Sequence, residues 1–422
     1  MILSHGSFFW PEQRMALSTR PATPRLLFCS YHSYLEPSNG AALATRDLLE
    51  LLAARGWECA VLCGPEEDSA QPTPLEGTLR SQNVPFQFRP GRVRDCSCTL
   101  YHCALNRVAV HAFVPVPAQP RQPPSREEGH AFLSLFDLAC QRFRPDLLLT
   151  YGGQWCAYPL ISRAKQMGVK VVFALHNCEY TGADLFREAD AILVPSRAVE
   201  EHYRSTLGLA STPLPGPWDW GRVLCRELQG HYITFVNPQP AKGVFWFARI
   251  AYELNRRRPD IPLLVVEGRG NTDWLARCDL DLSGLTNLHR MPSTYDPRHF
   301  YRVSRAVLMP SLWQEALGRV AVESSINGIP VLASRRGGLP EALAGAGFLF
   351  DIPEQYTATS CRTPTAEEVA PWSKVIEQLW DDGAYHAAEG ERSRRAAETW
   401  RPERLGPRFE EFFLQVMQKR GR

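Results

Sequence analysis

Residues 313–341, WQEALGRVAVESSINGIPVLASRRGGLPE, decide the fold of this chain. The apolar run 306–309 comes just before them and predicts a short buried strand. Residues 318–325 then show helical spacing of apolar side chains, and Gly328 stands where a helix commonly ends. The apolar run 329–333 predicts a second strand. Strand, loop, helix and strand in this order form a parallel α/β unit.

Two glutamates in this stretch indicate a binding function. Glu315 precedes the predicted helix and Glu323 follows eight residues later, which is about 12 Å along a helix that rises about 1.5 Å per residue. That spacing fits a hexose and a ribose joined by a diphosphate. The helix N-terminus between them offers unpaired N–H groups and a positive dipole end. We therefore expect Glu315 to bind a donor hexose, the backbone of Ala316, Leu317 and Gly318 to bind phosphate, and Glu323 to bind ribose.

Each glutamate also has a simpler interpretation. Glu323 can be the i,i+4 partner of Arg319 on a solvated helix face. Glu315 can be an acid favoured near a helix start. The flanking strands and the Gly-Gly-Leu-Pro-Glu turn at 337–341 favour the binding interpretation for the pair.

The motifs resemble a known family. Glu-x-x-Gly-x-x-x-x-Glu at 315–323, Gly-x-Pro-Val-x-Ala-Ser at 328–334 and Gly-Gly-x-x-Glu at 337–341 are similar to the E-x7-E signature of the retaining glycosyltransferases of family four, which have the GT-B fold. The resemblance covers roughly residues 24–415. It implies an α/β fold of two Rossmann-like domains facing across a cleft, with a C-terminal helix crossing back to the N-terminal domain. It also implies that the first glutamate contacts the donor sugar and the second the nucleotide ribose.

A length of 422 residues suits two domains with full cores. The net charge of +2 gives no argument for a nucleic-acid partner. We expect five segments: a poorly ordered N-terminal extension at 1–21, an acceptor domain at 22–212, a proline-rich linker at 213–230, a nucleotide-sugar donor domain at 231–400, and the final helix at 401–422.

The composition predicts a cytoplasmic protein. No apolar run reaches the length of a membrane span, and residues 1–21 lack the core of a signal peptide. The twelve cysteines, several of them in core-like strands, indicate reduced thiols. The basic segment 89–94 either faces an anionic acceptor, contacts phospholipid headgroups at the inner membrane face, or is a solvated strand edge. Its three charges alone are too few to predict anchoring.

Cys96, Cys98, His102 and Cys103 lie close together in the sequence. Their spacing differs from the CxxC pairs of common zinc sites. We expect a surface loop that carries thiols rather than a metal site.

The N-terminal half opens with a Rossmann-type pattern of strand, glycine-bearing loop, helix and strand, without a full GxGxxG motif. In the resembled family two adjacent glycines precede this helix and face the donor phosphates and the acceptor. Here only Gly40 is present, so it is either a donor-binding residue or a turn glycine. His176 ends the strand 169–175, where a structural role is common. Its position resembles the family's histidine beside the donor sugar, and we include it among the catalytic candidates.

Lys242 is one of only five lysines and lies directly before the predicted helix 244–257. A cation there neutralises a leaving diphosphate, although a solvated loop lysine is the simpler interpretation. The resembled family has a Lys-Gly pair at the same place, with the lysine on phosphate. The family's upstream arginine is absent, and Arg269 is a candidate for that second cation. The resemblance also implies base recognition by backbone near Met291.

These residues predict a hexosyltransferase of carbohydrate biosynthesis. It moves a hexose from a UDP-, GDP- or ADP-linked donor to a hydroxyl of a glycan, lipid or small molecule, and the resemblance implies retention of configuration. We expect no cofactor, and no metal because no Asp-x-Asp motif has a suitable setting. The alternatives are an epimerase, hydrolase or phosphorylase on the same fold, and a non-catalytic binding subunit.

Overall fold

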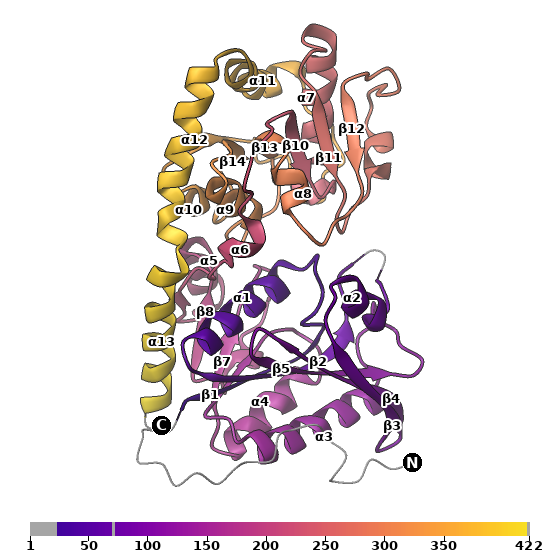
Figure 1. The fold of residues 1–422 in the computed structure, drawn as a ribbon, viewed down its shortest axis with the longest axis vertical. Helices are drawn as coiled ribbons and strands as arrows, with labels where there is room; N and C mark the ends of the chain where they lie inside the picture. The colour runs from indigo at the N-terminus through magenta and orange to yellow at the C-terminus, as the bar shows by residue number, and fades with distance from the viewer. Residues whose placement is uncertain (1–22, 70–71, 420–422) are drawn as a thin grey trace. The chain divides into compact units, whose positions relative to one another are not determined.

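The computed structural model describes residues 23–69 and 72–419, so the predicted extension at 1–21 lies outside the described residues. Contacts divide the chain into two compact units. Unit 1 contains the described residues up to Pro195, then Glu200–Trp218 and the described residues from Pro402 onwards. Unit 2 contains Ser196–Val199 and Asp219–Arg401. Figure 1 labels the helices and strands of both units.

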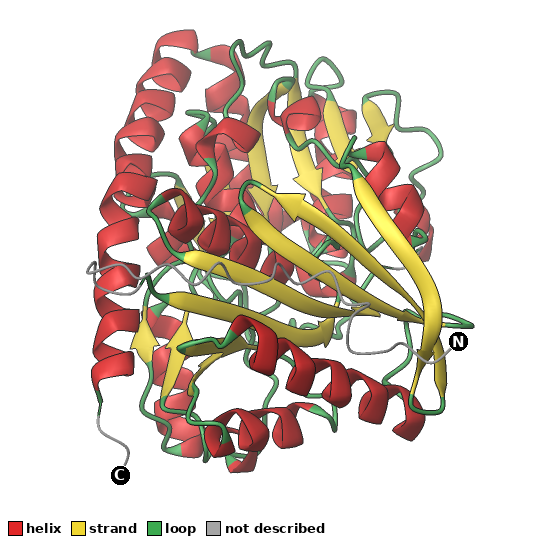
Figure 2. Cartoon of the chain, turned by 60° about the horizontal axis from the view of Figure 1, so that its bottom comes forward, coloured by secondary structure: helices red, strands yellow, loops and turns green. Residues whose placement is uncertain are grey.

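Unit 1 is built on a nine-stranded sheet with the order β3-β4-β5-β2-β1-β6-β7-β8-β9. The strands from β5 to β9 in this order are parallel neighbours, and β3, β4 and β5 pair antiparallel at one edge. The strands are β1 Arg25–His32, β2 Glu58–Glu66, β3 Phe86–Val93, β4 Cys96–Leu105, β5 Val108–Pro115, β6 Leu147–Thr150, β7 Lys170–Ala174, β8 Ala191–Val194 and β9 Thr212–Pro213. Figure 2 shows strands in yellow with helices in red beside them.

The helices of unit 1 connect these strands. They are α1 Gly40–Ala54, α2 Leu75–Ser81, α3 Arg126–Phe143, α4 Ala157–Gln166, η1 Asp184–Phe186, most of α5 Arg197–Leu207, and α13 Pro402–Gln418. A capping box of Ser125 and Glu128 starts α3.

Unit 2 has a fully parallel six-stranded sheet with the order β12-β11-β10-β13-β14-β15. Numbered within the unit this order is 3-2-1-4-5-6, that of the doubly wound Rossmann fold. The strands are β10 Tyr232–Val236, β11 Leu263–Val266, β12 Leu288–Met291, β13 Ser304–Met309, β14 Val331–Ser334 and β15 Phe348–Phe350. The helices are α6 Trp220–Val223, η2 Pro240–Lys242, α7 Val244–Arg257, η3 Thr272–Arg277, α8 Arg298–Tyr301, α9 Arg319–Ile326, α10 Leu339–Leu343, α11 Ala366–Asp381, α12 Gly383–Ala397 and η4 Glu398–Trp400. Ligands of such sheets bind outside the carboxyl ends of the strands, where the order reverses between β10 and β13.

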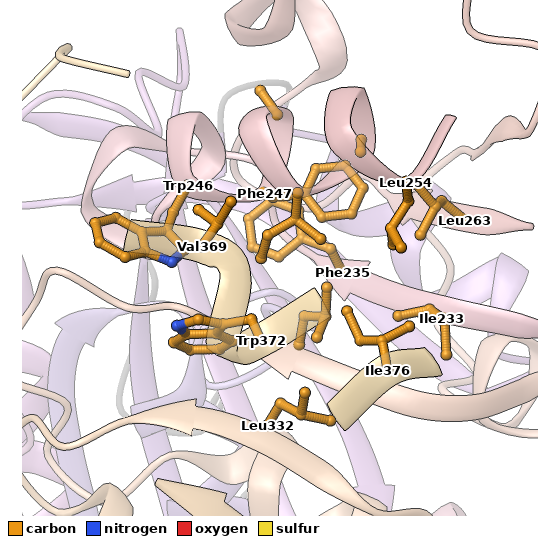
Figure 3. Packing of buried hydrophobic residues seen from close by; sticks show 14 of the residues in the cluster. Ile233, Phe235, Trp246, Phe247, Leu254, Leu263, Leu332, Val369, Trp372 and Ile376 are labelled. Atoms are coloured by element: carbon orange, nitrogen blue, oxygen red, sulfur yellow. The ribbon is translucent and has the colours of Figure 1, made fainter. Parts of the chain in front are cut away.

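The core of unit 2 lies between its sheet and the helices α7 and α11. Figure 3 shows side chains of both helices gathered against Ile233 and Phe235 of β10. Phe235 stacks on Phe247 of α7 with ring centroids 4.8 Å apart, and Trp246 lies edge-on to Tyr356. This packing holds the ends of β10 and β13 in fixed positions.

Several predicted elements differ from the structure. In the helical pattern of residues 366–380, Pro371 predicts a break. Helix α11 nevertheless runs through it, because a proline in the second turn removes only one hydrogen bond while buried Val369, Trp372 and Ile376 anchor the helix to the core. The helix predicted at 298–305 ends at Tyr301, since residues from Ser304 pair as β13. Pro213, the first residue of the predicted linker, forms with Thr212 the edge strand β9, which pairs with β8.

The last helix, α13, packs on unit 1. Phe413 is fully buried and its ring lies 6.0 Å from that of Trp57. Arg55 at the end of α1 pairs with Glu410 of α13 at 2.5 Å. The final helix is therefore part of the core of unit 1.

We predict that Phe413→Ala lowers the free energy of unfolding of unit 1 by about 3–5 kcal/mol, because it leaves a large cavity under α13. Urea unfolding followed by tryptophan fluorescence measures this. Leu414→Ala is the matched control, since Leu414 is exposed on the same helix and should change stability little. Equal effects of the two variants would contradict the assigned packing.

Candidate active site

Glu315 and Lys242 meet at the carboxyl ends of neighbouring strands. Glu315 lies in the loop from β13 to α9, and Lys242 ends the turn η2 between β10 and α7. Lys242 Nζ lies 2.6 Å from Glu315 Oε1. The sequence separates these residues by 73 positions, and the strand order brings them together where the sheet order reverses.

The Glu315 carboxylate is held in place by a second donor. It is 7% exposed, and Ser311 Oγ donates a hydrogen bond of 2.8 Å to the same Oε1 oxygen. Ser334 Oγ of β14 donates to the Ser311 carbonyl at 2.7 Å. Charge-assisted bonds of this kind are short and strong, so the side chain has a defined orientation.

The loops after β10 and β13 are also joined through the backbone. The N–H groups of Leu312 and Trp313 both donate to the Ala241 carbonyl, at 2.9 and 3.0 Å. Gly243 has φ +82°, and a Cβ on it would lie 1.9 Å from the Pro310 carbonyl oxygen. The glycine after Lys242 is therefore required by the close approach of the two loops.

The turn Gly337-Gly338 supports the Glu315 loop from its other side. The Gly338 N–H donates to the Glu315 carbonyl at 2.7 Å. A Cβ on Gly337 would lie 2.3 Å from that carbonyl oxygen, and one on Gly338 would lie 2.7 Å from Leu317 Cα. The paired glycines of the sequence motif thus let this turn pack against backbone.

We predict that Gly338→Ala lowers turnover by up to about a hundredfold, because shifting the Glu315 loop by about an ångström misplaces the site. Gly338 has φ −80°, so the effect is steric and not a backbone preference. Gly383→Ala is the control, since a Cβ there meets nothing within 4 Å. Steady-state kinetics of both purified variants checks this, and normal turnover of Gly338→Ala would contradict the assigned role of the turn.

Glu323 lies on α9 and is 7% exposed. Tyr301 Oη donates to its Oε2 oxygen at 2.9 Å, and Arg319 Nε donates to its Oε1 oxygen at 3.0 Å. The i,i+4 pair with Arg319 therefore exists, but the carboxylate is buried and does not belong to a solvated face.

The first turn of α9 has no capping side chain. Its N-cap residue is Gly318, with φ +102°, and a Cβ there would lie 2.7 Å from Leu339 Cδ2. The first N–H groups of a helix lack intrahelical acceptors. The N-terminus of α9, which follows Ala316, Leu317 and Gly318, is therefore suited to bind an anion.

Arg269 and Met291 lie at the same edge of the sheet of unit 2. Arg269 follows β11, and Met291 is the last residue of β12. The Met291 carbonyl accepts the Glu267 N–H at 2.9 Å, and Asn237 Oδ1 accepts the Gly270 N–H at 2.8 Å. Binding of the nucleotide-sugar donor by Arg269 and Met291 stays a prediction.

In unit 1, His176 follows β7, and the ends of β1 and β6 carry His32 and Tyr151. The Tyr151 ring lies edge-on to His176, with centroids 5.4 Å apart, and 5.6 Å from His32. Gly40 begins α1, whose N-cap is Asn39, and Asn39 Oδ1 accepts the N–H groups of Ala41 and Ala42. This cap already uses two N–H groups of that helix end. The role of Gly40 stays a prediction.

The surface loop predicted for the cysteine cluster is wrong. Cys96, Cys98 and Cys103 are buried residues of β4, and His102 stacks on His111 of β5 with centroids 4.7 Å apart. Burial raises the pKa of the Cys98 thiol to about 12. Among residues 23–69 and 72–419, no group of three or more His, Cys, Asp or Glu side chains is placed to hold a metal ion. No described helix has the length and apolarity to cross a bilayer.

The sequence did not single out several residues of the site. Ser311 and Tyr301 donate hydrogen bonds to Glu315 and Glu323, but a single serine or tyrosine carries no distinctive sequence signal. Outside this site, in unit 1, Glu66 ends β2 and Glu67 follows it. Burial, together with nearby carboxylates, raises the pKa of each to about 7.

Two family models match most of the chain. Residues 38–214 match a family model described as Glycosyltransferase Family 4, and residues 230–362 match one described as Glycosyl transferases group 1. The chain is 31% identical over 175 residues to the D-inositol 3-phosphate glycosyltransferase of Arthrobacter sp. (strain FB24), covering 40% of this chain and 37% of that protein. It is 37% identical over 110 residues to the protein of the same name from Thermobifida fusca, covering 24% and 25%. These matches span about a third of the relatives' length or less.

Solved structures resemble more than nine-tenths of the chain. HepE of Anabaena, in complex with UDP and glucose, has a TM-score of 0.65 at 14% identity, covering 92% of this chain and 99% of that one. The catalytic domain of starch synthase IV from Arabidopsis thaliana, bound to ADP and acarbose, has a TM-score of 0.66 at 13% identity, covering 94% and 100%. At such identities the likeness is one of fold.

Proposed function

The chain belongs to the glycosyltransferases of family 4, the group 1 glycosyltransferases, and on this premise we propose that it moves a hexose from a nucleotide-diphosphate sugar to an acceptor hydroxyl with retention of configuration. Its two Rossmann-like sheets and its structural neighbours confirm the predicted GT-B fold. The observation that carries the proposal is the Lys242–Glu315 pair, which lies where the strand order of unit 2 reverses. The buried Glu323 on the next helix supports it.

In the proposed reaction the diphosphate is the leaving group. Lys242 and the first turn of α9 stabilise its charge as the bond from the sugar C1 to the phosphate oxygen breaks. The acceptor oxygen forms a new bond to C1, and its proton passes to the leaving phosphate oxygen. Glu315 binds the donor sugar and Glu323 its ribose. The role proposed for His176, contact with the donor sugar, rests on the family resemblance.

The donor base and the acceptor are open within this proposal. Structural neighbours were solved with UDP or ADP, which supports a nucleotide donor. The relatives' name points to inositol phosphate as one acceptor to test. We propose that the reaction needs neither cofactor nor metal, because Lys242 and the helix end can neutralise the leaving group. Epimerase or hydrolase activity and a non-catalytic subunit are the alternatives.

We further propose that the enzyme works in the cytoplasm, with peripheral contact with an anionic membrane through β3. Phe88 is 54% exposed on this edge strand, beside the exposed Arg89 and Arg92. An apolar side chain among arginines suits a headgroup layer. Vesicles with and without anionic lipid test this, since co-sedimentation independent of anionic lipid would contradict it.

The proposed function is tested by nucleotide release from UDP-, GDP- and ADP-sugars, with and without candidate acceptors. Release that depends on an acceptor and is lost in Glu323→Ala supports the transferase and identifies the donor. Donor turnover without transfer to any acceptor would favour the epimerase or hydrolase. Binding without turnover would favour the non-catalytic subunit, and no binding of any nucleotide sugar by folded protein would overturn the assignment.

A further inference from the structure

Tyr301 is a fully buried residue whose hydroxyl reaches the candidate ribose-binding carboxylate. It ends α8, and its Oη donates to Glu323 Oε2 at 2.9 Å. Its exposed fraction is 0%. The residues are 22 positions apart and lie on different elements, so this contact is formed by the tertiary fold and not by a local turn.

The ring of Tyr301 is fixed by its surroundings. It packs in a cluster with Phe300 of α8, Leu264, Val266 and Val307 of two strands of the sheet, and Ile329 of the turn between α9 and β14. The Phe300 and Tyr301 ring centroids are 4.3 Å apart. A side chain packed in this way has one available position, so its hydroxyl is a fixed donor.

Glu323 is thus oriented from two directions. Tyr301 binds Oε2, while Arg319, with side-chain exposure of 19%, binds Oε1 at 3.0 Å. A hydroxyl that donates to a carboxylate favours its charged form. A carboxylate that is charged and fixed is a strong acceptor for the two vicinal hydroxyls of a ribose.

We propose that Tyr301 is a positioning residue that fixes Glu323 for the ribose diol, so that the enzyme selects ribonucleotide over 2′-deoxyribonucleotide donors. This inference rests on the proposed function. Tyr301 does not itself touch the substrate. It acts by holding the Glu323 carboxylate where the 2′- and 3′-hydroxyls donate to it.

A purely structural role predicts something different. If the Tyr301 hydroxyl only needs an acceptor in the core, its removal lowers stability and leaves nucleotide selection unchanged. Selection between two ligands that differ by one hydroxyl therefore separates the two roles. Inorganic pyrophosphate lacks the ribose, so its affinity measures only the binding of the diphosphate by Lys242 and the first turn of α9.

The test compares the wild type with Tyr301→Phe, which removes one oxygen and keeps the ring. The probes are a ribonucleoside diphosphate with the base identified by nucleotide release, its 2′-deoxy form, and inorganic pyrophosphate, each titrated by calorimetry. We expect ribonucleotide affinity to fall about tenfold, in line with the loss of a hydrogen bond to a charged group. The ribo-to-deoxy affinity ratio should approach one, and pyrophosphate affinity should stay unchanged.

Tyr356→Phe is the matched control. Tyr356 is also a buried tyrosine of unit 2, and its Oη donates to Glu368 Oε2 at 2.6 Å. Removing this bond breaks the same kind of Tyr–Glu contact away from Glu323. The ribo-to-deoxy ratio of this variant should equal that of the wild type.

The outcomes separate the inference from the function. A wild type that binds no nucleotide contradicts the proposed function. A wild type that prefers ribonucleotides, with Tyr301→Phe keeping the same ratio, overturns the inference and leaves the function intact. If Tyr301→Phe does not fold, Arg319→Leu removes the other partner of Glu323, and an unchanged ratio in that variant overturns the positioning of Glu323 by its partners.

Discussion

Glu315→Gln should lower kcat for sugar transfer by about a hundred- to a thousandfold, the usual loss when one charge-stabilising group is removed from a site. Glutamine keeps the shape of the side chain but cannot stabilise the positive charge that develops on the donor sugar. Nucleoside diphosphate affinity should rise or stay equal in the same variant. Glu315 Oε1 lies 2.6 Å from Lys242 Nζ, so the carboxylate competes with phosphate for this ammonium group.

Steady-state kinetics and calorimetric titration of the purified variant measure the two effects. Glu391→Gln is the control, because Glu391 forms an exposed pair with Arg395 on α12 and its loss should change neither quantity. A Glu315→Gln variant with normal kcat would remove Glu315 from the reaction. Weaker nucleotide binding would contradict the competition between Glu315 and phosphate.

Lys242→Met should lower kcat/KM by about a hundred- to a thousandfold, because the leaving diphosphate loses its point charge. Methionine keeps most of the length and removes the cation. Binding of inorganic pyrophosphate should weaken in parallel, since the charge acts on the phosphate and not on the sugar. The Ser311–Glu315 bond remains in the variant, which keeps the carboxylate oriented.

Lys374→Met is the matched control for this change. Lys374 is exposed on α11 in the same unit, and its replacement should leave both kcat/KM and pyrophosphate affinity at wild-type values. Unchanged kcat/KM for Lys242→Met, measured at low ionic strength where charge effects are largest, would show that another cation neutralises the leaving group.

The sequence predicted unit 2 well because its signals are local. Apolar runs marked β13 and β14, and Gly328 marked the end of α9. The strand order then brings Lys242 to Glu315, although no local pattern links residues so far apart. The pair Gly337-Gly338 was recognised from the sequence as part of a motif. Its physical reason, the close approach to the backbone of the Glu315 loop, is visible only in the structure.

The predictions failed where tertiary pairing decides the structure. The spacing of Cys96, Cys98 and Cys103 differs from that of common zinc sites, so a surface loop was expected, but pairing with β3 and β5 makes this segment a strand with its thiols buried. The hydrogen bond from Tyr301 to Glu323 joins two helices, and no local sequence pattern indicates that they are in contact. The Asn39 cap of α1 was not predicted either.

The most direct test of the central claim, that unit 2 holds a nucleotide-sugar donor at the ends of β10 and β13, is a crystal structure with the nucleoside diphosphate that nucleotide release identifies. We predict a phosphate oxygen about 3 Å from Lys242 Nζ, the diphosphate on the first turn of α9, and the ribose hydroxyls on Glu323. The Lys242–Glu315 pair should then be open. A nucleotide bound elsewhere, with that pair still closed, would contradict the account.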